Sequence, residues 1–494
     1  MTLPQAFRLS LRDDIKLVEE VDGGLTLQKA DQPLAFKHLS QGWHALLKQL
    51  ATSGATEHEL GRIVLDIDGE ASLLHFYPKM QQLLQKGIVC HTVMADNRPF
   101  ATIIPIASAY RFQEALPDPQ QPYILSRFAY CHSQHGQFTL DSPLAYAKIA
   151  LHDARASALL AMLAQPQTVM ELSKPELGLE ANTVRMFLAL LLNAQAIVAV
   201  DASGQNMEES SPTLAQWEFH DLLFHSRSRF GRHNNPYGGT FASKGKFAAL
   251  PAIKEVRSDE IIPLDKPDLA RLVETDPPLT AVIEQRRSIR THGEKPISIQ
   301  QLGEFLYRVA RVKKLISIES DELGVSFRPY PAGGALYELE IYPVINRCAG
   351  LAAGLYYYHP LNHHLCKIAE RNSQVDMLLD MAGSTALMQS QPQLYFAITS
   401  RFQRLQWKYQ GVAYALMLKH VGVLYQTMYL AATAMGLAPC ALGGGNADLF
   451  AAAAQLDYYA ETTVGEFVLG TIGEARPQGE HKIPAAIHSG VQIH

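Results

Sequence analysis

The hydrophobic pattern of the first two hundred residues occurs twice. In each copy a leucine-rich stretch with helical spacing is followed by a Thr-x-x-Glu box, at residues 46–60 and again at residues 159–172. The threonine of such a box accepts a backbone N–H at a helix start and the glutamate bonds back to the cap residue, so both copies predict helix, turn, helix. Each copy then runs from an apolar helix end into a β-branched strand, at residues 83–89 and 191–198, and in the first copy residues 97–99 turn back into a second strand. We expect two winged helix-turn-helix-like domains.

Helical and strand patterns alternate from residue 278 to the end of the chain. This alternation predicts an α+β domain in which helices flank a mixed sheet. The expected helices cover residues 298–312 and 412–436, and the expected strands cover residues 338–345, 354–358, 394–400 and 467–472.

A polar stretch rich in serine, proline and aspartate separates these two regions. It predicts a linker that contains one helix, at about residues 213–225. The expected domains are therefore residues 1–112 and 113–204 for the two winged-helix copies, 205–277 for the linker and 278–494 for the α+β domain.

Composition narrows the classes of protein that fit this pattern. The 494 residues are 47% hydrophobic, enough to give each of about three domains a core, and the net charge is −5. The five cysteines, which form no CxxC pair, fit neither a disulfide framework nor a zinc site, so we expect no metal. The N-terminus carries no apolar signal-peptide stretch. The longest apolar stretch, 412–436, is interrupted by Lys419, His420 and Gln426, which predicts a buried helix in a cytoplasmic protein without a membrane partner.

The charge of the N-terminal copies argues against nucleic acid as the partner. Residues 1–200 contain 16 Lys and Arg against 19 Asp and Glu, and the helix expected at 181–195 carries only Arg185. A helix that reads DNA normally presents several basic side chains to phosphates and base edges. A peptide-binding or purely structural role is therefore favoured, and we expect a peptide to add as a strand beside a wing.

Three clusters in the last domain have the composition of a ligand site. Residues 286–290 place three arginines and a serine within five positions, which suits a phosphomonoester because guanidinium groups bind phosphate with two parallel hydrogen bonds. Residues 331–337 include two glycines that would let backbone amides approach a flat ligand. Residues 439–446 follow the long helix and contain three consecutive glycines, at 443–445.

In this order and at these separations, the three clusters resemble those of the FMN-binding nitroreductase superfamily. The segment 401–409, Arg-Phe-Gln-x-x-x-Trp-Lys-Tyr, resembles the Lys-Tyr motif of azoline dehydrogenases, and the two N-terminal copies resemble leader-peptide recognition modules of the same pathways. From residue 25 to 476 the chain is similar to a cyanobactin oxidase. Ala332 and Glu338 depart from the family pattern, which has serine and proline at these two positions.

The resemblance implies an oxidase that turns peptide thiazolines and oxazolines into thiazoles and oxazoles. It implies FMN as cofactor, a precursor peptide with azoline rings and further enzymes of the pathway as partners, and a homodimer in which two subunits share each flavin site. The implied cofactor-binding residues are Arg286, Arg287, Ser288, Arg290, Pro331, Gly333, Gly334, Ala335, Leu442, Gly443, Gly444 and Arg476.

Lys408 and Tyr409 are the catalytic residues that the resemblance implies. Aromatising an azoline removes a proton from the ring carbon next to the carbonyl and a hydride equivalent from its neighbour, so the protein must supply a base. A lysine is a base only when burial or a nearby positive charge keeps it neutral, whereas a tyrosine needs a nearby cation. The residues leave open which of the two acts, and the triplet 407–409 is also compatible with a helix start that carries a solvated lysine.

Two other functions compete with this hypothesis. The first is an NAD(P)H-dependent nitro- or flavin reductase with the same cofactor site, for which about 200 residues of peptide-binding architecture have no evident use. The second is a flavin-sensing DNA-binding regulator, which the acidic N-terminal half disfavours.

Overall fold

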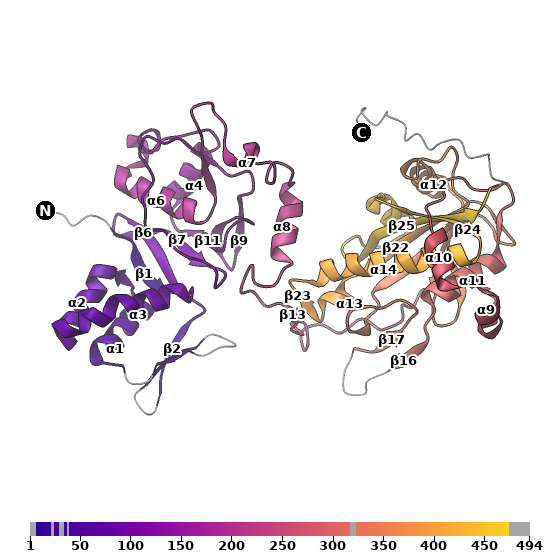
Figure 1. Ribbon diagram of the computed structural model, residues 1–494, viewed down its shortest axis with the longest axis horizontal. Coiled ribbons are helices and arrows are strands. Elements are labelled where there is room, and N and C mark those ends of the chain that lie inside the picture. The colour runs from indigo at the N-terminus through magenta and orange to yellow at the C-terminus, as the bar shows by residue number, and fades with distance from the viewer. Residues whose placement is uncertain (1–5, 21–23, 29–33, 37–38, 317–322, 474–494) are drawn as a thin grey trace. The chain divides into compact units, whose positions relative to one another are not determined.

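The computed structural model describes residues 6–473 apart from 21–23, 29–33, 37–38 and 317–322. The chain divides into two compact units, residues 1–237 and residues 238–494 (Figure 1). Among the described residues, no helix combines the length and apolar character needed to cross a membrane.

The first unit contains both expected winged-helix copies. Its main strands are β1 (Arg8–Leu11), β5 (Ala55–Thr56), β6 (Val89–Ala95), β7 (Arg98–Pro105), β9 (Tyr130–Gln134), β10 (Gln137–Asp141) and β11 (Ala147–Leu151), and smaller sheets pair β2 (Lys16–Glu19), β3 (Leu25–Gln28) and β4 (Leu34–Phe36), and β8 (Tyr123–Leu125) with β12 (Ile197–Ala199). Its helices are α1 (Gln41–Thr52), α2 (Glu57–Asp68), α3 (Leu73–Gln85), α4 (Ala154–Met162), α5 (Val169–Leu172), α6 (Ala181–Asn193), α7 (Met207–Ser210) and α8 (Phe219–Arg227).

The helical part of the expected repeat is present in both copies. Thr56 with Glu59 caps α2, and Thr168 with Glu171 caps α5, each as a complete capping box. The copies differ after their third helix. In the first copy β6 and β7 form the expected hairpin, whereas in the second copy β12 pairs with β8, which precedes the helices.

The two copies share one continuous sheet. Its strand order is β5-β1-β6-β7-β11-β10-β9, so β7 of the first copy pairs directly with β11 of the second. The wing strands therefore already have neighbours on both sides, β1 next to β6 and β11 next to β7. The hairpin of the first copy therefore offers no free edge for an added strand, whereas β8 and β12 of the second copy form a two-stranded sheet. That a peptide adds as a strand to these domains stays a prediction.

The expected linker contains more structure than one helix. The helix α8 begins at Phe219, not near residue 213, and α7 precedes it within the first unit. Further along, β14 (Ile261–Pro263) pairs with β21 at an edge of the second unit's sheet and α9 (Leu269–Thr275) follows. A short edge strand among polar residues lacks the apolar alternation by which strands are recognised in a sequence.

The second unit is built around another seven-stranded sheet, in the order β14-β21-β20-β18-β22-β25-β24. Its other elements are α10 (Leu279–Gln285), α11 (Ile299–Ala310), β18 (Leu339–Ile345), β20 (Gly354–His359), β21 (His364–Glu370), α12 (Ser373–Thr385), β22 (Leu394–Arg401), α13 (Phe402–Gln406), α14 (Ala413–Ala434), β24 (Leu437–Leu442), α15 (Ala447–Ala454) and β25 (Glu461–Thr471). Short strand pairs join β13 (Gly238–Gly239) to β23 (Tyr409–Gln410), β15 (Ile297–Ser298) to β19 (Cys348–Ala349) and β16 (Lys314–Ile316) to β17 (Val325–Phe327).

The large sheet of the second unit is antiparallel at every pairing of its strands, not mixed as expected. Parallel pairing occurs between the two-residue strands β15 and β19. Helices cover both faces of the sheet, so β18 and β22 are buried along their whole length. Such strands have the continuous apolar sequence that is typical of parallel sheets, which is why the sequence predicted a mixed sheet.

Helices on both faces make this unit a three-layer structure. Alternate side chains of β18 point to opposite faces, so Ile341 packs with α11 and α14 while Val344 packs with α12 and α15.

The helix α14 is not wholly buried as the sequence suggested. The positions Tyr414, Leu418, Gly422 and Gln426, which are spaced four residues apart, are all exposed, whereas Met417, Leu424 and Met428 on the other side of the helix are buried. Within one chain, α14 therefore has an uncovered stripe.

Candidate active site

The loop at residues 331–335 is held against α14 by a buried histidine. The backbone N–H of Gly333 donates to His420 Nε2 at 2.8 Å, and His420 Nδ1 lies 2.6 Å from Glu338 Oε1. Because Nε2 accepts a hydrogen bond, its ring carries the hydrogen on Nδ1, which donates to the carboxylate. The row of hydrogen bonds from Glu338 through His420 to Gly333 thus ties the loop to the helix and orients the imidazole ring.

Glu338 is a structural anchor in this arrangement. Its side chain is fully buried at the start of β18, and Oε2 has no hydrogen-bond partner among the described residues. Glu338, which stands where the family pattern has proline, therefore supplies the carboxylate that orients His420.

Gly334 brings the loop into contact with the two predicted catalytic residues. Its φ is +62°, and a Cβ at this position would lie 2.8 Å from Tyr409 Oη and 2.9 Å from Lys408 Nζ. A side chain there would be strained by the left-handed backbone and would collide with both groups. Only glycine permits this approach between residues that are more than seventy positions apart.

Lys408 lies in a half-buried aromatic environment between α13 and β23. Its Nζ is 5.3 Å from the ring centres of Phe241 and of Tyr409, and its carbonyl accepts the N–H of Phe241. It forms no ion pair with any carboxylate in the described part of the chain. The helix-start interpretation of residues 407–409 is wrong, because the triplet follows a helix and leads into a strand.

The residues just before Lys408 are anchored in the interior. Arg404 is fully buried and donates to the carbonyls of Leu336, at 2.7 Å, and Leu250, at 2.6 Å; burial and neighbouring cations lower its pKa to about 10. Trp407 is buried as well and donates its indole N–H to the Phe247 carbonyl. These bonds hold the short helix α13 against the glycine loop and so determine where Lys408 points.

The arginine cluster and the end of the long helix meet at a second place. Ser288 Oγ lies 2.7 Å from Tyr429 Oη, which also accepts the backbone N–H of Ala441 at 2.8 Å. The Arg286 guanidinium is 5.2 Å from the centre of the Tyr429 ring. The first and third predicted clusters are therefore neighbours in the structure.

The remaining predicted cofactor residues border these two places. Pro331, Arg287, Arg290, Gly443 and Gly444 are exposed, Leu442 is buried, and Ala335 has a φ of +56° within the loop. Arg476 lies outside the described residues.

The predicted site forms two groups within one chain. We call residues 331–335 together with Lys408 and Tyr409 the loop group. We call residues 286–290 together with Tyr429 and residues 439–444 the arginine group. The loop group meets α14 at His420 and the arginine group meets it at Tyr429, nine residues later. At 1.5 Å of rise per residue these contacts are about 13 Å apart along the helix.

Sequence reasoning missed several residues of both groups. His420 was visible only as a polar interruption of an apolar helix, and Glu338 only as a departure from the family pattern. Phe241 and Tyr429 carried no signal, because an aromatic residue in a loop or an apolar helix is usually a packing residue.

Three family models match consecutive parts of the chain. The "ThcOx helix turn helix domain" matches residues 3–114, "Cyanobactin oxidase ThcOx" matches residues 123–234, and the "Nitroreductase family" matches residues 283–471.

Individual relatives match parts of the chain. A protein of Methanocaldococcus jannaschii described as a nitroreductase is 27% identical over 165 residues, which are 33% of this chain and 78% of that protein. The microcin B17-processing protein McbC of Escherichia coli is 27% identical over 206 residues, 40% of this chain and 75% of McbC. A chain of the E. coli microcin synthetase McbBCD complex is 22% identical over 51% of this chain and 91% of that chain, with a TM-score of 0.34, a likeness too low to add to the assignment.

The chain is an oxidoreductase in which residues 283–471 match the nitroreductase family and are preceded by helix-turn-helix domains, and the expected fold class is confirmed. Both N-terminal matches are to domains of a cyanobactin oxidase, so the chain resembles this group of oxidases over residues 3–114 and 123–234. The predicted resemblance is confirmed at this level.

The close contact at Gly334 predicts that a side chain at this position destabilises the second unit. We expect Gly334→Ala to lower the free energy of unfolding of the second unit by about 1–2 kcal/mol, because alanine is strained at this φ and its methyl group would displace Lys408 and Tyr409. Gly436→Ala is the matched control, since its φ is +65° and a Cβ there has nothing within 4 Å, so it has the backbone strain without the collision. Calorimetric melting of both variants measures the difference, and equal melting temperatures for Gly334→Ala and the parent would contradict the strained contact.

Proposed function

We propose that this protein oxidises thiazolines and oxazolines in a ribosomally made peptide to thiazoles and oxazoles, with FMN as cofactor. The observation that carries the proposal is the loop group, in which Lys408 Nζ and Tyr409 Oη both lie against Gly334. The family resemblance assigns this loop to the flavin, so the two candidate bases lie where a flat ring system would be bound. A leader segment of the precursor peptide would bind the N-terminal domains.

The residues present fit the phosphate of FMN. Arg286, Arg287 and Arg290 form no ion pair within the described ranges, so their guanidinium donors are free to neutralise a dianion. The Ser288 and Tyr429 hydroxyls, hydrogen-bonded to each other, add polar groups beside Arg286. A free dianion-binding set near the glycines at 443–445 suits a mononucleotide, and the sequence has no adenine-binding fingerprint.

Lys408 and Tyr409 would perform the proton transfer. One of them would remove the proton from the ring carbon next to the peptide carbonyl, and the other also lies against Gly334. Phe241 and the Tyr409 ring surround the lysine with apolar surface, which reduces its access to water. When bound, FMN would supply the acceptor for the hydride equivalent from the neighbouring carbon, with molecular oxygen as the terminal oxidant.

The separation of the two groups supports a homodimer. A site divided by about 13 Å along α14 is completed if the loop group of one subunit faces the arginine group of the other. The uncovered stripe on α14, with Leu418 at 40% exposure and Gly422 open to solvent, provides a surface for the second copy. Because the stripe is part of the same helix that carries His420 and Tyr429, pairing along it brings both groups near the subunit interface.

The assignment of the base predicts a loss of turnover without loss of cofactor. Lys408→Ala should lower the oxidation rate of an azoline peptide by about 10² to 10⁴, the usual cost of removing a positioned base, while flavin absorbance stays at the parent level. Tyr409→Phe should show an equal or smaller loss. Wild-type turnover by Lys408→Ala at saturating substrate would place the base elsewhere. Rapid reduction of the flavin by NAD(P)H, with no azoline oxidation by the parent, would favour a reductase.

The arginine group predicts the identity and the retention of the cofactor. Heat-released flavin should be FMN by chromatography. Arg286→Ala should weaken its retention about tenfold or more, because a charge-assisted hydrogen bond contributes about 1.5–3 kcal/mol. Arg257→Ala, which removes an exposed arginine outside both groups, is the control for the change in net charge. Full flavin occupancy in Arg286→Ala, or FAD in the released fraction, would count against the assignment.

The shared site predicts that dimerisation and flavin binding are lost together. Gly422→Arg introduces a long charged side chain where one chain leaves open space, so the monomer should fold normally and the pair should not form. Light scattering should report a monomer, and the flavin content should fall. Leu387→Arg, at a position that is 70% exposed and outside α14, should remain dimeric. A Gly422→Arg dimer with full flavin content would contradict this mode of pairing.

A further inference from the structure

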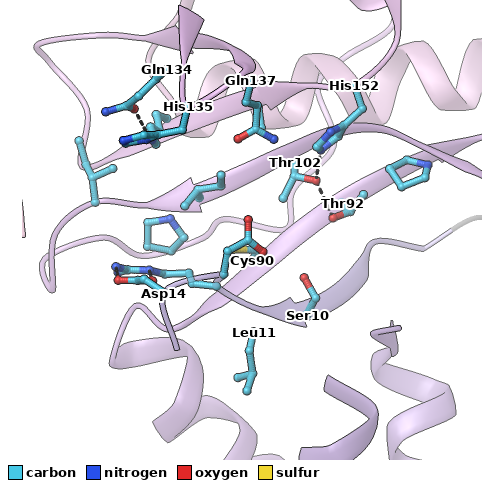
Figure 2. Close-up of a pocket in the computed structure, with 18 of the residues that line it drawn as sticks. Ser10, Leu11, Asp14, Cys90, Thr92, Thr102, Gln134, His135, Gln137 and His152 are labelled. Atoms are coloured by element: carbon cyan, nitrogen blue, oxygen red, sulfur yellow. Dashed lines mark hydrogen bonds and ion pairs between the residues drawn. The ribbon is translucent and has the colours of Figure 1, made fainter. Parts of the chain in front are cut away.

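In the described part of the first unit, one face of the seven-stranded sheet is not covered by helices apart from the end of α8, whose Arg227 lines this side. The helices α4 and α6 pack on the opposite face, against Ile103, Leu140 and Ile149. The uncovered face lines a hollow of about 1270 Å³ formed by residues of the first unit alone (Figure 2). No step of the proposed oxidation uses this surface.

The floor of the hollow is polar and ordered by hydrogen bonds. Thr92 Oγ1 lies 2.8 Å from Thr102 Oγ1, which lies 2.9 Å from a ring nitrogen of His152 (Figure 2). These contacts link β6, β7 and the residue that follows β11. A sheet face of this kind is unsuited to packing against an apolar helix. It offers hydroxyl, imidazole and amide groups to a polar ligand.

The hollow is bordered by a sheet edge that can accept a further strand. In the hairpin of β9 and β10, Gln134 pairs with Gln137 across a two-residue turn, whose residues His135 and Gly136 both have positive φ. In an antiparallel ladder the pair next to such a turn is hydrogen-bonded and the next one is not, so the N–H and C=O of Ser133 point away from β10. The same alternation applies to Cys131, and both residues are exposed.

Alternate side chains of β9 point into the hollow. Tyr130, His132 and Gln134 line it, whereas Cys131 and Ser133 do not. The helix α8 touches only the beginning of the strand in the contacts described, through the rings of Phe219 and Tyr130. A peptide strand paired with β9 would therefore send every second side chain over the same floor.

The hollow also contains a cation without a counter-ion. Lys148 Nζ reaches across β10 to donate to Gln134 Oε1 at 2.6 Å and forms no ion pair within the described part of the chain. Arg12 and Arg227 are already paired, with Asp14 and Asp141. Burial lowers the pKa of Lys148, and the more distant carboxylates of Asp141 and Asp14 act in the opposite direction. A carboxylate of a bound peptide would complete this site.

We propose that the edge of β9 and the hollow beside it bind an extended peptide segment with an acidic side chain directed to Lys148. This inference rests on the proposed function, in which the first unit recognises the leader part of a precursor peptide, and it names the surface that does so. The small sheet β2-β3-β4, whose outer strands also have free edges, is the alternative binding surface within this unit.

The test uses the full-length chain and a displayed library of random linear 14-residue peptides. Selected peptides should share an Asp or Glu at one position and should protect the amides of Cys131 and Ser133 from hydrogen exchange. Ser133→Pro should weaken binding about tenfold, because proline removes the outward N–H while an edge strand tolerates it, and Ser133→Ala should bind as the parent does.

Charge reversal tests the role of the lysine. Lys148→Glu should weaken binding of the acidic peptides about tenfold, Lys148→Arg should retain it, and peptides with lysine in place of the acid should bind Lys148→Glu better than they bind the parent. Lys174→Glu, at an exposed position outside the hollow, is the control for net charge. Selected peptides that are insensitive to both Ser133→Pro and Lys148→Glu would overturn this assignment and leave peptide recognition by the first unit intact. A library that yields no binders to the first unit would contradict peptide recognition itself.

Discussion

The hydrogen-bonded chain from Glu338 through His420 to the N–H of Gly333 determines the geometry of the candidate active site. It connects the start of a central strand, the middle of the long helix and the glycine loop, three segments that are distant in sequence. Each member is buried or half-buried, so none of the bonds competes with bulk water, and the loss of one partner would leave a buried polar group unpaired. The positions of Gly334, and through it of Lys408 and Tyr409, depend on this anchor.

The long helix α14 acts as the common frame of the site. It receives the glycine loop at His420 and the arginine group at Tyr429, and its buried side chains fix it to the central sheet. A straight helix keeps a constant distance between two contacts on it. The separation of the two groups is therefore a fixed property of each chain, and the uncovered stripe of Tyr414, Leu418, Gly422 and Gln426 lies on this same helix.

The elements with a strong periodic pattern were predictable from the sequence. The two capping boxes, α11, and strands β18, β20 and β22 were expected close to their observed bounds, because burial on one helix face or along a whole strand leaves a clear pattern. Strand direction was not predictable, since a strand buried on both faces has the same composition in parallel and antiparallel sheets. Nor was the shared sheet of the two N-terminal copies, because the pairing of β7 with β11 depends on contacts between repeats that look independent.

The same limit applies to the candidate site. Its clusters were visible because glycine and arginine are chemically distinctive, whereas their grouping depends on Tyr429 and His420, which lie in a helix whose other residues are apolar. The meeting of Lys408 with Gly334 required a fold in which residues 334 and 408 are neighbours, and no local pattern encodes such a contact.

The continuous sheet of the first unit has a consequence for how the chain folds during synthesis. Pro105 of β7 pairs with Ala147 of β11, so the outer edge of the β6–β7 hairpin stays unpaired until some forty further residues have left the ribosome. Contacts of this sequence separation form slowly, and an exposed strand edge can pair with other chains in the meantime. The first copy on a nascent chain is therefore an incomplete folding unit, and the arrival of β11 closes the edge and commits both copies to a single cooperative structure.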